Sequence, residues 1–90
     1  MFVILAVVPT VLRIGSLRVV IYSNDHRPAR VHVIGADCEA VFVLGCPAGR
    51  VRLRENYGFA WRELNFIEKT LAEHFDELCQ AWEETHGHAE

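Results

Sequence analysis

The spacing of apolar residues changes once along the chain, from the period of a strand to the period of a helix. Up to about residue 54, apolar and polar side chains alternate in short runs that turn-forming residues separate. From Trp61 onward, apolar residues recur every three or four positions, at Leu64, Ile67, Leu71, Phe75, Leu78 and Trp82. This order predicts an α+β fold. An antiparallel meander of four or five strands (residues 10–54) precedes one long C-terminal helix (residues 61–86), which packs on one face of the sheet.

The first two strands are joined by a two-residue turn, which fixes how they pair. Residues 11–14 and 17–22 flank Gly15-Ser16, and glycine in first place suits a type II′ turn because that position needs a positive φ. Arg13 is then opposite Arg18, and opposed residues share a face. One face of this hairpin is therefore apolar, and the other carries Arg13, Arg18, Val20 and Tyr22.

The predicted helix is longer than the sheet that it covers. A helix over residues 61–86 measures about 39 Å at 1.5 Å per residue, whereas a six-residue strand spans about 20 Å. We therefore expect its last turns, with Leu78 and Trp82, to extend beyond the sheet and face a partner. The alternative is a kink near Glu73 and His74. Gly87 is a typical residue for the end of the helix.

Length and composition are those of one globular domain over residues 1–90. A hydrophobic content of 51% excludes a disordered chain. Three cysteines without CxxC spacing predict no disulfide framework and a cytoplasmic location. Residues 1–8 form an apolar N-terminal extension that is too short to span a membrane and lacks the charged start of a secretory signal. We expect no membrane association; a misassigned start codon is an alternative origin of these residues.

Charge is divided between the two halves of the chain. The net charge of −3 combines +3 over residues 1–58 with −6 over residues 59–90. Every cationic side chain before Lys69 is an arginine, whose planar guanidinium suits carboxylate and phosphate. These arginines predict a face that binds an anion or a partner; a merely solvated face is the alternative. The residues assigned to it are Arg13, Arg18, Tyr22, Arg27, Arg30, Arg52 and Arg54.

Two histidines stand among these arginines and are candidate catalytic residues. His26 belongs to a turn-rich loop and His32 to the strand that follows. Histidine exchanges protons near neutral pH and arginine stabilises an anionic transition state, so the pair suits acid–base chemistry on a phosphodiester. A binding surface without turnover is the alternative. No third ligand stands at a metal-binding spacing, and we predict neither a metal nor a cofactor.

Three stretches of the chain resemble one small bacterial family. They are residues 9–12, residues 26–33, and Gly58-Phe59 followed by Arg62-Glu63-Leu64 and Ile67-Glu68. The family is catalogued as a domain of unknown function and labelled as the DhiT-type toxin of a type II toxin–antitoxin pair. The resemblance covers residues 9–87, and its most specific feature is a Pro-Pro-His-x-His run. Here Ala29 replaces the second proline and Arg30 the first histidine, while His32 matches.

The resemblance implies a cognate antitoxin protein as the partner. If the first histidine of the run is a catalytic acid or base in the family, Arg30 inactivates this member. If that histidine only contacts an anionic partner, arginine is a workable replacement.

Residues and resemblance together predict a bacterial toxin that binds its antitoxin and acts through the Arg/His face on a nucleic-acid-linked or translational target. A non-catalytic interaction or regulatory module and a small metal-independent ribonuclease are the alternatives, so enzymatic activity stays open. A homodimer is a further expectation, because the basic sheet of one copy complements the acidic helix of another.

Overall fold

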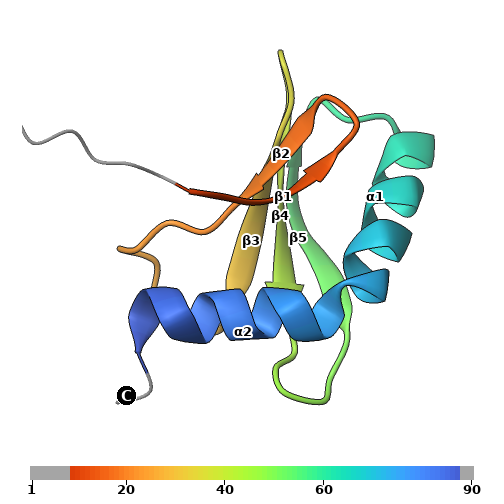
Figure 1. The fold of residues 1–90 in the computed structure, drawn as a ribbon. Helices are drawn as coiled ribbons and strands as arrows, with labels where there is room; N and C mark the ends of the chain where they lie inside the picture. The colour runs from red at the N-terminus through yellow and green to blue at the C-terminus, as the bar shows by residue number, and fades with distance from the viewer. Residues whose placement is uncertain (1–8, 88–90) are drawn as a thin grey trace, which may run out of the picture.

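The computed structural model describes residues 9–87 and shows a five-stranded sheet followed by two helices (Figure 1). All neighbouring strands are antiparallel and the order β1-β2-β3-β4-β5 follows the chain, which confirms the predicted meander. The strands are β1 (Thr10–Ile14), β2 (Leu17–Val20), β3 (Arg30–Ile34), β4 (Glu39–Leu44) and β5 (Val51–Tyr57). The expected N-terminal extension, residues 1–8, lies outside the described residues.

The β1–β2 hairpin has the predicted register. Arg13 is opposite Arg18, and Ile14 is opposite Leu17. Gly15 has a φ of +60°, which a side chain at this position would strain. The two-residue turn therefore determines which side chains of β1 and β2 face the core.

The C-terminal region consists of two helices, and the prediction of one long helix is wrong. Helix α1 (Trp61–Glu73) and helix α2 (Phe75–His86) meet at His74, which caps both. The break corresponds to the alternative kink near Glu73 and His74. In Figure 1, α1 lies beside β5, while α2 runs across the strands and contacts β4. At about 20 Å and 18 Å, the two helices match the dimensions of the sheet.

Because of this break, the residues that were expected to extend beyond the sheet pack inside the molecule. Leu78 and Trp82 are each 1% exposed and belong to the core. Their predicted role as a partner-facing end is therefore wrong: the turn at His74 directs the apolar stripe of α2 back onto the sheet. Gly87 follows α2 with a φ of +74°, as expected for the residue that ends it.

Helix α1 begins after a turn that side chains stabilise. The Asn56 amide accepts from the backbone N–H of Phe59 and donates to the carbonyl oxygen of Phe59, both at 3.0 Å. The Glu63 carboxylate accepts from the N–H of Ala60 at 2.8 Å, which satisfies a backbone donor at the helix start. The Phe59 side chain joins the core.

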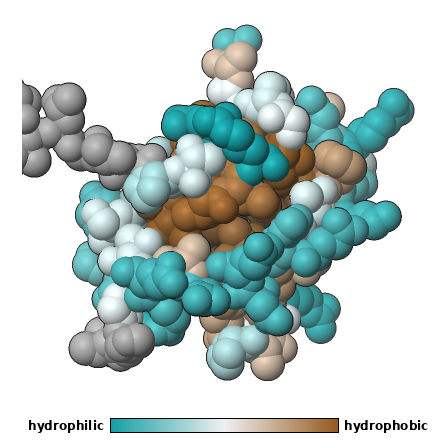
Figure 2. Space-filling view, in the orientation of Figure 1, coloured by the Kyte–Doolittle hydropathy of each residue, from teal (hydrophilic) through white to brown (hydrophobic). Residues whose placement is uncertain are grey.

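The apolar inner face of the sheet packs against the two helices. Alternate residues of β2, β3 and β4 meet the apolar stripes of α1 and α2 there. Figure 2 shows apolar side chains gathered in the middle of this face, with hydrophilic residues of the helices around them. Neither α1 nor α2 covers the outer face of the sheet. Within residues 9–87, neither helix has the length and apolar composition needed to cross a membrane.

A disulfide joins Cys46, in the β4–β5 connection, to Cys79 in α2. This contradicts the prediction of no disulfide. The two cysteines are 33 positions apart in sequence, and only the return of α2 across the sheet brings them together. Cys38 is the remaining, free cysteine.

We predict that Cys79→Ser lowers the free energy of unfolding by about 3–4 kcal/mol, because the disulfide closes a long loop of the unfolded chain. Thermal unfolding with and without a reductant measures the same loss in the wild-type protein. Cys38→Ser is the matched control and should change stability by less than about 1 kcal/mol. Equal melting temperatures for Cys79→Ser and the oxidised wild type would contradict the disulfide.

Candidate functional site

Strand register arranges the outer face of the sheet in three rows. Opposed residues on neighbouring strands share a face, so each row can be followed from strand to strand. The rows are Arg13, Arg18, Ile34, Glu39 and Tyr57; Val20, His32, Val41 and Glu55; and Arg30, Val43 and Arg52. The middle row, with His32, therefore has arginines in the rows on both sides.

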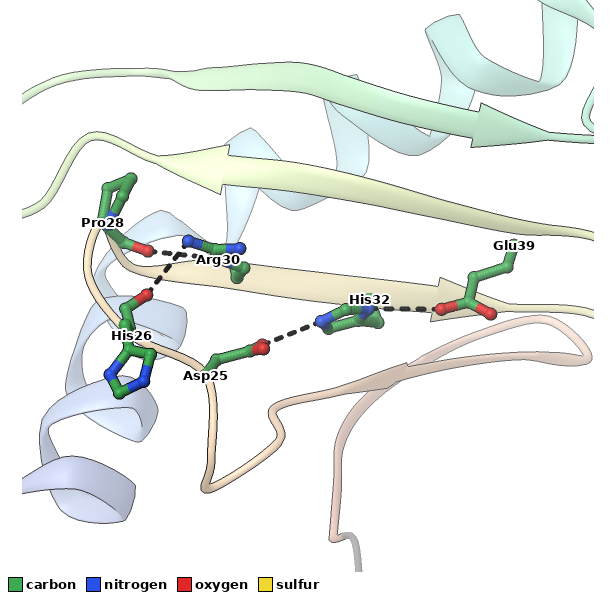
Figure 3. A network of polar contacts seen from close by, with 6 residues as sticks. All are labelled: Asp25, His26, Pro28, Arg30, His32 and Glu39. Atoms are coloured by element: carbon green, nitrogen blue, oxygen red, sulfur yellow. Dashed lines mark hydrogen bonds and ion pairs between the residues drawn. The ribbon is translucent and has the colours of Figure 1, made fainter.

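His32 lies at the centre of a polar network (Figure 3). Its Nε2 is 2.8 Å from Oδ2 of Asp25, and its Nδ1 is 3.2 Å from Oε2 of Glu39. The ring of Tyr22 meets the imidazole edge-on, with the ring centroids 4.5 Å apart. Carboxylates only accept hydrogen bonds, so His32 satisfies both partners when both ring nitrogens carry protons. The ring is thus fixed in position by three neighbours.

The two carboxylates differ in their accessibility. The side chain of Asp25 is 19% exposed and that of Glu39 is 42% exposed, whereas His32 itself is 13% exposed. Asp25 is therefore suited to orient the imidazole. Glu39 is the partner that a substrate group can displace, and displacement frees Nδ1 of His32 for proton transfer.

Arg30, which stands where the resembled family has a histidine, contacts the loop before β3. Its Nε donates to the carbonyl oxygen of Pro28 at 3.3 Å, and its Nη2 donates to that of His26 at 3.1 Å. These bonds hold the loop against β3. Because guanidinium has five N–H donors, Arg30 retains others for an anion.

His26 does not join His32. Figure 3 shows the ring of His26 on the side of the loop toward α2, whereas Asp25 points to His32. His26 and Arg27 are exposed and line a cavity next to α2 instead. The structure thus separates the two predicted catalytic histidines into different surroundings.

The remaining predicted arginines lie on or beside the outer face. Arg13, Arg52 and Arg54 are exposed, and Arg18 is partly buried. A bulge in β5 leaves Arg54 without a partner on β4 and sets Glu55 opposite Val41. The outer face is therefore a mixed surface, in which carboxylates accompany the expected cations.

Tyr57 and Glu55 form a second polar contact at the β5 edge. The Tyr57 hydroxyl donates to Oε1 of Glu55 at 3.1 Å. This hydrogen bond and the negative charge of Glu55 raise the pKa of the Tyr57 hydroxyl, which keeps it a neutral donor.

Sequence reasoning did not identify Asp25, Glu39, Glu55 and Tyr57 as site residues. Glu39 could have been found from the alternation of its strand, because it is on the same side as Val41 and Val43, which pair with His32 and Arg30. Asp25 could not have been found in this way, because it reaches His32 through the conformation of an irregular loop, which strand alternation does not predict. In the part of the chain that the structure describes, no three His, Cys, Asp or Glu residues are grouped as a metal would require.

A family model described as a domain of unknown function, DUF4160, matches residues 17–83. Comparisons with curated proteins and with solved structures give no match. The family match spans most of the chain, from β2 to the last turn of α2, and includes the whole His32 network. The chain therefore belongs to the DUF4160 family.

We predict that Asp25→Ala lowers the free energy of unfolding by about 1–3 kcal/mol, because Nε2 of His32 loses its partner in a partly buried site. Urea unfolding at neutral pH gives this difference. Asp37→Ala, in the exposed β3–β4 turn, removes the same group and should cost less than about 0.5 kcal/mol. Equal losses in both variants would show that the Asp25–His32 contact does not stabilise the fold.

Proposed function

We propose that this member of the DUF4160 family is the toxin of a bacterial toxin–antitoxin pair, neutralised by a cognate antitoxin protein. The resemblance of residues 9–87 to a toxin family supports the role in a pair. The outer face of the sheet supports the mode of action: contact with an anionic target, either a nucleic acid or a nucleic-acid-containing part of the translation machinery.

The observation that carries this proposal is the arrangement of groups around His32. Asp25 orients the ring from one side, and the half-exposed Glu39 occupies the other nitrogen. Alternate residues of a strand are about 7 Å apart, so Arg18 and Arg30 lie in rows next to that of His32. A phosphate bound next to His32 therefore has an arginine-bearing row on each side.

The same groups suit proton transfer at a phosphodiester. A ribose hydroxyl that displaces Glu39 meets Nδ1 of His32, which acts as the base when the ring is neutral and its one proton is on Nε2, facing Asp25. The hydroxyl gives its proton to Nδ1 and its oxygen bonds to the adjacent phosphorus. The P–O5′ bond breaks, the 5′ oxygen leaves with a proton from water, and Asp25 stabilises the positive charge on the ring. Arginine in the neighbouring rows offsets the charge that develops on the phosphate. Cleavage of RNA without a metal is therefore the enzymatic form of the proposed activity.

A second candidate function is binding without turnover. It is favoured by the occupation of both nitrogens of His32, which makes the ring a structural link between the loop and β4. In that case the arginines bind the target and His32 only maintains the surface.

We predict that induction of this chain in a bacterial culture arrests growth and that His32→Gln abolishes the arrest, because glutamine cannot exchange a proton. Growth curves after induction, with soluble protein quantified, are the measurement. The control Arg62→Gln removes an exposed arginine from α1, away from the outer face, and should retain the arrest.

The combined variant Arg18→Gln and Arg52→Gln distinguishes the two candidates. Arrest that survives His32→Gln but not the arginine changes identifies a binding module. If neither the wild type nor Arg30→His arrests growth despite good soluble expression, the toxin role is wrong.

A further inference from the structure

A cavity of about 460 Å³ lies between the loop after β2 and the C-terminal turns of α2. Loop residues 23–27 form one wall, and Trp82 and His86 form the other. Its volume is in the range of cavities that bind small molecules. The outer-face chemistry around His32 does not use it, since only Asp25 is common to both places.

Two nitrogens in the helix wall have no hydrogen-bond partner among residues 9–87. Nε1 of Trp82 and Nε2 of His86 are both buried and unpaired. Trp82 is 1% exposed, and its ring stacks on that of His86 with the centroids 3.6 Å apart. Unpaired buried polar atoms are rare and each asks for an explanation, such as a missing partner. His86 is in the last turn of α2, and its Nδ1 is 3.2 Å from the carbonyl oxygen of Trp82, so the two unpaired nitrogens are the ones that a ligand in the cavity can satisfy.

The loop wall is rich in hydrogen-bond donors and includes one arginine. Arg27 offers a planar guanidinium, His26 an imidazole, and Ser23 and Asn24 a hydroxyl and an amide. The carboxylate of Asp25 is already engaged with His32. This wall therefore suits an anionic oxygen group, and the stacked aromatic wall suits a flat ring.

We propose that this cavity binds a nucleotide unit, with its phosphate on Arg27 and His26 and its base against the His86–Trp82 pair. The unit comes from a free nucleoside monophosphate or from the 5′ end of an RNA strand. The proposal stands independently of the toxin role, because its residues other than Asp25 do not belong to the outer face.

Trp82 provides the readout for a test. The chain has two tryptophans, and Trp61→Phe removes the exposed one, so that the remaining emission comes from the cavity wall. This protein is titrated with AMP, UMP, adenosine, inorganic phosphate and a 5′-phosphorylated tetraribonucleotide. We expect a saturable change in emission with the monophosphates or the tetranucleotide, and at least about tenfold weaker binding of adenosine and inorganic phosphate.

Variants connect the binding to the proposed contacts. Arg27→Gln should weaken nucleotide binding by about tenfold or more through loss of a bidentate contact. Arg50→Gln, a matched loss of charge in the exposed β4–β5 turn, should leave binding unchanged. Since Arg27 is exposed, its variant tests the site without disturbing the core.

If the tetranucleotide binds more tightly than the free monophosphates, the site is assigned to an RNA end. If the monophosphates bind equally or more tightly, it is assigned to a small nucleotide. Both results support the proposal. It is overturned if no compound gives a saturable change, if inorganic phosphate binds as well as AMP and UMP, or if Arg27→Gln binds normally. None of these results depends on growth arrest.

Discussion

Burial of Trp82 against the inner face of the sheet determines how the C-terminal half is arranged. This large side chain reaches the core only because the chain breaks at His74 and α2 runs across the strands. The same course brings Cys79 to Cys46 and places the last turn of α2 beside the loop after β2. The disulfide, the cavity and the position of His86 all follow from one packing requirement.

The loop after β2 relates the two faces of the molecule. Asp25 binds His32 on the outer face, while the neighbouring His26 and Arg27 line the cavity beside α2. Arg30 fixes the loop through two backbone carbonyls. Loop residues 23–27 thus contribute to both the His32 network and the cavity. A substitution that moves the loop is therefore expected to affect both sites. For this reason, exposed positions such as Arg27 and Arg52 are better probes of function than Asp25.

Short-range sequence patterns predict the features of the fold that neighbouring residues determine, such as turns and the periodicity of strands and helices. Gly15 determines the register of the hairpin because its positive φ selects the turn, and that register was predictable from the sequence. The helical stripe was predictable too. The break at His74 was expected only as an alternative, because one long helix would outrun the sheet; the apolar spacing itself does not show it, since it continues in phase through His74 although the axis changes direction. The disulfide and the contact of Asp25 with His32 join distant or irregular segments, for which spacing carries no signal. A bulge in β5 likewise changed the outer face by bringing Glu55 onto it.

The mixed charge of the outer face limits how it can recognise a target. With Glu39 and Glu55 among the arginines, this surface lacks the broad positive field that draws nucleic acid from a distance. The net charge of −3 and the acidic helices repel a polyanion, but both helices pack on the opposite side of the sheet. For the nucleic-acid target that we propose, attraction therefore has to arise at short range, from guanidinium groups that meet individual phosphates. Such a surface neutralises few phosphates, so its affinity depends only weakly on salt and its selectivity rests on geometry. The fixed position of His32 between two carboxylates suits recognition of that kind, because a rigid centre accepts only a target whose groups fit around it.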